Sequence, residues 1–123
     1  VYKFARAVSD AGADLIIGHG PHVLRAMEIY NNSFIAYSLG NFVGYKQFSL
    51  AGNNGISAIL QITLNDNLKI DSAKVIPIKL INGGIPNVDS SNEAIKKLNN
   101  YSDLDFPNSG IKFNSEGEAI LNK

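Results

Sequence analysis

A short apolar run between two glycines most constrains the fold of this chain. Leu15–Ile17 are three consecutive large aliphatic residues that follow Gly12 and precede Gly18. We therefore expect a strand from Asp14 to Gly18, because a continuous apolar run is typical of a strand that is covered on both faces. Residues 1–11 place apolar side chains at near-helical spacing, and Gly12 stands where such a helix would end. The order of helix, short loop, buried strand and loop indicates a layered α/β domain.

From residue 25 onward the pattern changes to that of antiparallel hairpins. Consecutive asparagines tolerate a positive φ, so Asn31-Asn32-Ser33 predicts a tight turn. The segment 56–64 alternates apolar and polar residues with period two, which favours a half-buried strand. The expected strands are 26–30 and 34–39 around that turn, then 56–64 and 68–80 around residues 65–67, with a loop over 43–55.

The last third predicts a strand break, one helix and a final strand. Gly83-Gly84-Ile85-Pro86 is expected to break the strands, and Ser90 or Ser91 to cap a helix over 92–100. A last short strand is expected over 119–121. We interpret residues 1–123 as a single unit. Because the chain opens at Val1 in what looks like the middle of a helix, we expect an excised piece of a longer protein.

Composition excludes several classes of function. Eleven basic residues balance eleven acidic ones, so no global field attracts nucleic acid, and nucleic acid is not an expected partner. The chain has no cysteine, which excludes disulfides, zinc ribbons and thiol catalysis. No apolar run approaches the roughly 18 residues of a membrane span. A hydrophobic content of 45% with 18% charged residues describes a globular chain.

The two histidines of the chain, His19 and His22, lie in Gly18-His19-Gly20-Pro21-His22, directly after the apolar run. Neutral imidazole is a common ligand of Zn²⁺, Mn²⁺ and iron. We expect Gly20 to make a sharp turn between the two rings and Pro21 to hold the second ring. A metal ion needs three or four donors, and a two-metal hydrolase site needs more.

Other donors near the histidines are few. The candidates are Asp14, Glu28 and the Asn41 amide, and Asp14 heads the strand at the end opposite His19. The chain therefore supplies about half a metal site. Two other interpretations stay open: acid–base use of one histidine without a metal, and a polar loop without a site.

A second motif, Tyr37-Ser38-Leu39-Gly40-Asn41-Phe42, ends a strand with a glycine turn. The Asn41 carboxamide can coordinate a metal or hydrogen-bond a phosphate oxygen, and its alternative role is a simple turn cap. Arg25 lies three residues after His22 and is a candidate for contact with an anionic substrate. The predicted site is therefore His19, His22 and Asn41 as catalytic residues, the two histidines as metal ligands, and Arg25 with Asn41 as substrate contacts.

The stretches Gly12–Leu24, Glu28–Tyr30 and Tyr37–Val43 resemble the bacterial CapA-type domain of poly-γ-glutamate capsule synthesis. That family is similar to the calcineurin-like metallophosphoesterases, whose fold is a four-layer α/β/β/α sandwich around a two-metal centre. The resemblance implies that this chain is the C-terminal half of such a sandwich, mostly antiparallel after residue 25. It also implies that His19 and His22 contact metal or phosphate. The motifs that supply the other ligands in the superfamily have no counterpart here.

The resemblance implies a metal-dependent hydrolase or phosphoesterase-like function in capsule synthesis, using one or two divalent ions of Mn, Zn or Fe. The expected substrate is an anionic polymer or a phosphate-bearing molecule. The alternatives are a non-catalytic scaffold or polyanion-binding subunit and a purely structural domain. Because half a sandwich leaves apolar surface uncovered, we expect self-association or pairing with the missing N-terminal half, and an inactive chain in isolation. The family resemblance places the parent protein in a membrane assembly at the extracytoplasmic face of the cell envelope.

Overall fold

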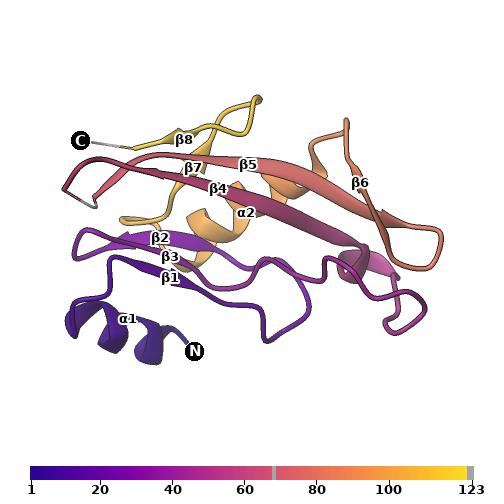
Figure 1. Ribbon diagram of the computed structural model, residues 1–123, viewed down its shortest axis with the longest axis horizontal. Coiled ribbons are helices and arrows are strands. Elements are labelled where there is room, and N and C mark those ends of the chain that lie inside the picture. The colour runs from indigo at the N-terminus through magenta and orange to yellow at the C-terminus, as the bar shows by residue number, and fades with distance from the viewer. Residues whose placement is uncertain (68, 122–123) are drawn as a thin grey trace.

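The computed structural model describes residues 1–67 and 69–121 (Figure 1). Leu68, the first residue of one predicted strand, lies outside the described residues. No helix in these ranges is both long and apolar enough to cross a membrane. The elements in chain order are α1 (Tyr2–Asp10), β1 (Leu15–Ile17), β2 (Met27–Tyr30), β3 (Ser33–Ala36), the 3₁₀ helix η1 (Gly52–Gly55), β4 (Ile56–Leu64), β5 (Ile70–Ile81), β6 (Ile85–Val88), α2 (Glu93–Asp105), β7 (Lys112–Phe113) and β8 (Ala119–Ile120).

The strands form two three-stranded sheets and a small two-stranded ribbon. The first sheet has the order β1-β3-β2, in which β1 pairs with β3 in parallel and β2 pairs with β3 antiparallel. The second sheet has the order β4-β5-β6 and is antiparallel throughout. Asn31 and Asn32 adopt φ values of 47° and 66° in the β2–β3 turn, as the consecutive asparagines predict. The α/β class and the antiparallel pairing after residue 25 are confirmed.

The main core lies between the two sheets and is closed by α2, which contacts β2, β4, β5 and β7. Its buried members are Leu24, Met27, Phe34, Ala36, Ile56, Ala58, Ala73, Val75, Ala94, Ile95, Leu98, Ile111 and Phe113. A smaller core, Ala5, Ile35 and Tyr37, joins α1 to the opposite face of the first sheet. Figure 1 shows the first sheet between α1 and the long β4–β5 hairpin, so the layers run helix, sheet, sheet.

The expectation that Leu15–Ile17 is buried on both faces is wrong. Leu15 and Ile17 are 38% and 42% exposed. The reason is position in the sheet: β1 is an edge strand that pairs with β3 on one side. Burial of an apolar run depends on what packs against it, and an edge strand has fewer neighbours than a central one.

Two expectations for the last third need correction. Gly83 and Gly84 do interrupt the strands, in a turn of positive φ after β5, but Ile85 and Pro86 are not part of the break, because they begin β6, the antiparallel partner of β5. The helix cap is not Ser90 or Ser91. The N-cap position of α2 is Asn92 in the left-handed region, and the Asp89 carboxylate accepts the backbone N–H of Glu93 at 3.1 Å. The helix continues to Asp105, beyond the predicted end at residue 100.

Candidate functional site

Parallel pairing of β1 with β3 brings the two predicted motifs together. Ile17 lies opposite Ala36, so the histidine loop and the Tyr37–Phe42 segment leave the same end of the sheet. The backbones stay paired beyond the strands, because the Gly18 N–H donates to the Ala36 carbonyl at 2.8 Å. The Leu39 N–H in turn donates to the Gly18 carbonyl at 3.1 Å. Two segments that are separate in sequence therefore form one local site.

Two glycines make this close approach feasible. A Cβ on Gly18 would lie 2.4 Å from the Tyr37 carbonyl oxygen, and Gly40 has a φ of +77° with the Ile56 carbonyl oxygen 3.0 Å from its Cβ position. The expected turn between the two rings is present, because the His22 N–H donates to the His19 carbonyl at 3.4 Å. It does not require a glycine at position 20, whose Cβ position is open and whose φ is not in the left-handed region; His22 takes a positive φ of 61°.

Both histidines are exposed, and each turns Nδ1 toward the Gly40–Asn41 turn. His22 Nδ1 lies 2.8 Å from Asn41 Oδ1, whereas His19 Nδ1 lies 3.5 Å from the Gly40 carbonyl oxygen. The His22 ring also packs against Phe48, with 4.9 Å between ring centroids. His19, His22 and Asn41 are thus brought together, with one side of each imidazole anchored on the same turn.

The other sequence-derived donors lie elsewhere. Asp14 forms an ion pair with Lys69 at 2.5 Å at the far end of β1. Glu28 is fully buried and is engaged by other side chains. No group of three His, Cys, Asp or Glu side chains within the described ranges is arranged to hold a metal ion. The donor set at this turn is therefore two imidazoles.

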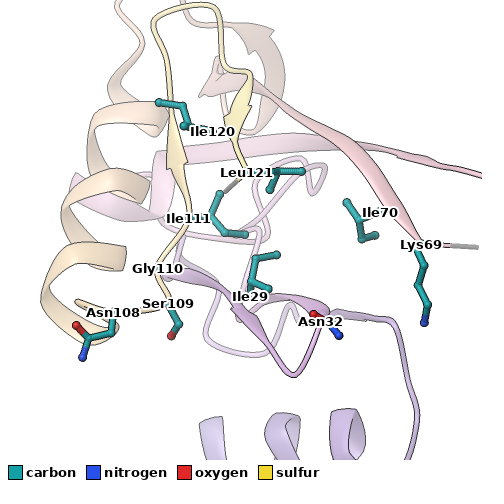
Figure 2. Close-up of a pocket in the computed structure, with 10 residues that line it drawn as sticks. All are labelled: Ile29, Asn32, Lys69, Ile70, Asn108, Ser109, Gly110, Ile111, Ile120 and Leu121. Carbon is teal, nitrogen blue, oxygen red and sulfur yellow. The ribbon is translucent and has the colours of Figure 1, made fainter. Parts of the chain in front are cut away.

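Arg25 does not join the histidines. It lines a cavity of about 720 Å³ between α1, the histidine loop and the end of α2, together with Arg6, Tyr37 and Phe106. A second cavity of about 570 Å³ has an aliphatic wall that includes Ile29, Ile70 and Ile111 (Figure 2). None of the predicted site residues lines that second cavity.

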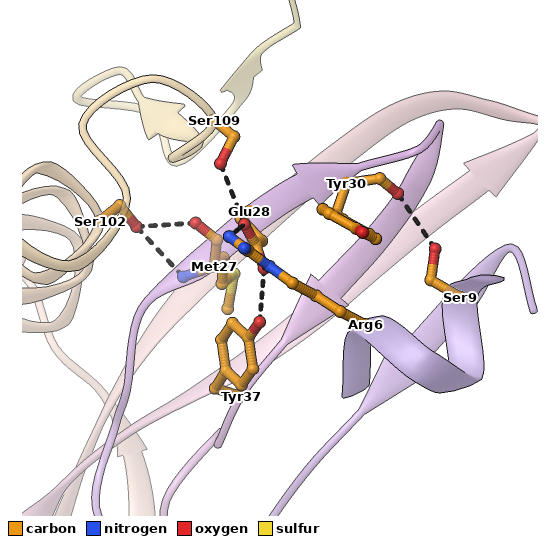
Figure 3. Close-up of polar contacts among 8 residues, drawn as sticks. All are labelled: Arg6, Ser9, Met27, Glu28, Tyr30, Tyr37, Ser102 and Ser109. Atoms are coloured by element: carbon orange, nitrogen blue, oxygen red, sulfur yellow. Dashed lines mark hydrogen bonds and ion pairs between the residues drawn. The ribbon is translucent and has the colours of Figure 1, made fainter. Parts of the chain in front are cut away.

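A buried polar cluster around Glu28 is the feature that sequence reasoning missed (Figure 3). The Glu28 carboxylate accepts two hydrogen bonds from Arg6, at 3.1 and 2.8 Å, one from the Tyr37 hydroxyl, and one from the Ser109 hydroxyl at 2.9 Å. The Arg6 guanidinium also lies over the rings of Tyr30 and Phe106. The cluster therefore connects α1, β2, the residue that follows β3 and the segment after α2.

The cluster perturbs the pKa of each of its three titratable members. Burial raises the pKa of the Glu28 carboxyl, but the hydrogen bonds from Arg6, Tyr37 and Ser109 outweigh it and hold the pKa below the ordinary value. Burial, followed by the bond to Glu28, raises the pKa of Tyr37. The bond to Glu28 also raises the pKa of Arg6. The sequence holds one signal of this role, because Glu28 is the only acidic residue between Leu15 and Asn65.

The stretch that contains both histidines is poor in acidic residues. Residues 15–65 contain Arg25 and Lys46 as well as both histidines, and their single carboxylate is buried against Arg6. Most acidic side chains of the chain lie outside this stretch. Within residues 15–65, basic side chains therefore outnumber acidic ones.

Known proteins match this chain over the segment that contains the histidine loop and Asn41. Residues 2–46 match the family described as bacterial capsule synthesis protein PGA_cap. The chain is 66% identical over 41 residues to the PGA biosynthesis protein CapA of Bacillus subtilis (strain 168), a match that covers 33% of this chain and 11% of the relative. It is 46% identical over 63 residues to the capsule biosynthesis protein CapA of Bacillus anthracis, covering 51% of this chain and 15% of that relative.

The matches thus span well under a fifth of the length of either relative. A 38-residue segment is also 63% identical to an uncharacterized protein, y4sH, of Sinorhizobium fredii. The family match contains α1, the histidine loop and Asn41. Over residues 2–46, this chain is therefore similar to the bacterial capsule synthesis protein PGA_cap family.

Proposed function

We propose that this chain contributes two imidazole ligands to a divalent-metal site of the phosphoesterase kind in a capsule synthesis protein. The observation that carries the proposal is the geometry of His19 and His22. Both rings are exposed, both leave the same end of the first sheet, and both turn Nδ1 toward one turn. Such anchoring of one ring nitrogen is how proteins orient histidine ligands.

The donor chemistry fits a divalent ion in part. Imidazole suits Zn, Mn or Fe, so His19 and His22 would hold one ion or contribute to a pair. A site needs about four donors, and we propose that the others come from residues outside this chain. When bound, the metal would activate water and polarise the substrate. The chain's own residues fix the geometry: Gly18 and Gly40 admit the close backbone approach, and Asn41 holds His22.

The proposed substrate is an anionic polymer, such as poly-γ-glutamate, or a phosphate-bearing molecule. Two observations support an anionic ligand: the one carboxylate of residues 15–65 is buried, and Arg25 lines a cavity that Pro21 of the histidine loop also lines. The same observations favour a second candidate function, a non-catalytic polyanion-binding subunit of a capsule assembly. For either function we propose a location at the extracytoplasmic face of the cell envelope, in a membrane-associated assembly, because the named relatives are capsule proteins.

Metal content separates the two candidates. The protein that carries this chain is purified without chelator, and bound metal is measured by mass spectrometry in the wild type and in a His19→Ala/His22→Ala variant. Lys96→Ala, an exposed change on α2, serves as control. We expect metal in the wild type and control and its loss in the double variant. A metal-free wild type that still binds poly-γ-glutamate would support the second candidate, and unchanged occupancy in the double variant would contradict the ligand assignment.

We further propose that the unpaired edge of β1 is covered, either by a second copy or by the N-terminal half of the domain. Its support is the exposed apolar surface on both sides of that edge, at Val1 and Phe4 on the side of α1 and at Leu15 and Ile17 on the other side. Light scattering after size-exclusion chromatography measures whether the chain self-associates. We expect oligomers, and a monodisperse monomer would argue against this proposal.

A further inference from the structure

We propose that Asn41 is a positioning residue that holds His22 in the tautomer with its proton on Nδ1, so that Nε2 is the atom offered to a ligand. The argument starts with the orientation of the Asn41 amide. Its Nδ2 lies 3.4 Å from the Asn54 carbonyl oxygen. A carbonyl oxygen only accepts, so the amide nitrogen must face it and Oδ1 must face His22.

The orientation of the Asn41 amide determines which nitrogen of the His22 imidazole carries the proton. Asn41 Oδ1 is also only an acceptor, and it lies 2.8 Å from His22 Nδ1. A contact this short requires a proton on Nδ1. A neutral imidazole with its proton on Nδ1 has its free electron pair on Nε2, which makes Nε2 the nucleophilic and metal-binding atom. In water an unrestrained histidine side chain favours the opposite tautomer, so the contact reverses an intrinsic preference.

Several features hold this arrangement rigidly. Asn41 is 7% exposed, so water competes little for its amide. The Asn54 carbonyl belongs to η1, whose turn is closed by the Asn54 N–H donating to the Ala51 carbonyl at 3.3 Å. Phe48 packs against the imidazole of His22, with 4.9 Å between the ring centroids. The segment 48–55, which the sequence indicates only as a loop, therefore supports His22 through Asn41 and Phe48.

His19 provides a contrast within the same site. Its Nδ1 lies 3.5 Å from the Gly40 carbonyl oxygen, at the limit of a hydrogen bond. The proton on His19 is therefore fixed less firmly than the proton on His22. Because the chain has only these two histidines, the four imidazole nitrogens can be assigned without ambiguity from other residues.

The experiment records long-range ¹⁵N–¹H spectra of the ¹⁵N-labelled 123-residue chain at about pH 8.5, where histidine side chains are ordinarily neutral. The variants are Asn41→Leu, which removes the acceptor, and Asn41→Asp, which keeps it. Asn53→Leu makes the same change in the neighbouring η1 at a side chain that does not contact His22. Backbone amide spectra establish that each variant is folded.

We expect a protonated Nδ1 and an unprotonated Nε2 for His22 in the wild type, Asn41→Asp and Asn53→Leu. Asn41→Leu should exchange these two signals for His22 and leave His19 as it was. A wild-type His22 with the proton on Nε2, or an unchanged His22 in folded Asn41→Leu, would overturn the proposal. If Asn41→Leu does not fold, loss of the Nδ1 proton in Asn41→Asp would overturn it equally.

The role of Asn41 as the support of a metal ligand rests on the proposed function, whereas the tautomer itself does not. Zinc added to the wild type separates the two. We expect the His22 Nε2 signal to shift on zinc binding while the Nδ1 proton stays in place. A zinc-induced shift of Nδ1 instead of Nε2 would refute the positioning role. If zinc shifts neither histidine in the protein that carries this chain, the metal site fails while the tautomer assignment stands.

Discussion

Replacing Glu28 by glutamine should destabilise the fold more than almost any other conservative change in this chain. Glu28 is fully buried, and its two carboxylate oxygens accept the hydrogen bonds from Arg6, Tyr37 and Ser109. Glutamine keeps the shape of the side chain but replaces one oxygen by an NH₂ group. Because all the partners are donors, that NH₂ group would face another donor wherever it points.

The size of the stability loss depends on the interactions that Glu28→Gln removes and on how well water can solvate the groups that are left. Breaking a buried ion pair by removing one partner costs about 3–5 kcal/mol, since the remaining charge is left without compensation. The Arg6 side chain is 34% exposed, so water can solvate part of its charge and lower that cost. The Tyr37 hydroxyl is buried and recovers less. We expect Glu28→Gln to lower the free energy of unfolding by about 3 kcal/mol.

The pH dependence has a definite sign. The folded-state pKa of Glu28 is lowered from its ordinary value of 4.5, so its contribution is present at neutral pH. That contribution begins to be lost as the pH falls below about 4.5, and it is gone once the folded-state carboxyl is protonated. The stability difference between wild type and Glu28→Gln should therefore be largest near pH 7 and shrink on acidification.

Urea denaturation followed by far-ultraviolet circular dichroism measures both effects, at pH 7 and at several values below 4.5. Glu116→Gln is the matched control, because Glu116 is exposed, and it should change stability by less than about 0.5 kcal/mol. A loss below about 1 kcal/mol for Glu28→Gln at pH 7 would refute the reasoning. A difference that grows on acidification would show that the sign of the linkage is wrong.

Two further predictions use the same denaturation assay. Gly18→Ala should cost about 2–3 kcal/mol, because its Cβ would lie 2.4 Å from a backbone oxygen, whereas Gly20→Ala has open space and should change stability by about 0.5 kcal/mol or less. Equal effects would contradict the close approach at Gly18. Asp89→Ala should cost about 1 kcal/mol through the lost bond to the Glu93 N–H, and Ser90→Ala almost nothing. A larger loss of stability in Ser90→Ala than in Asp89→Ala would support Ser90 as the helix cap, as expected from the sequence.

The parts of the fold that could be predicted from sequence are those fixed by neighbouring residues. The β2–β3 turn needs two residues with positive φ, and the two asparagines that supply it are adjacent. The alternation over residues 56–64 likewise reports one strand, and β4 covers that range. Backbone preference and the spacing of apolar side chains depend on a few neighbouring residues, so these elements can be predicted directly from the sequence.

The parts that failed depend on contacts between distant residues. Glu28 and Arg6 are 22 positions apart, and the residues near either one do not predict its contact with the other. Leu15 and Ile17 have the composition of a buried strand, but their exposure depends on β1 being at the edge of the sheet. The helix cap failed for a different and local reason, because the Asp89 carboxylate, which lies before the two serines and four positions before Glu93, accepts the Glu93 N–H.

The histidine site lies between these two cases. Each of its motifs is visible in the sequence, but their union depends on the parallel register of β1 and β3, which places Ile17 beside Ala36. The β2 hairpin lies between the motifs in sequence and on the far side of β3 in space. A change in the length of its turn would leave the register of Gly18 and Tyr37 intact. An added residue between Ala36 and Asn41 would move the Asn41 amide away from His22. The site is therefore specified by strand register and by the spacing after β3, and only secondarily by the distance in sequence between its motifs.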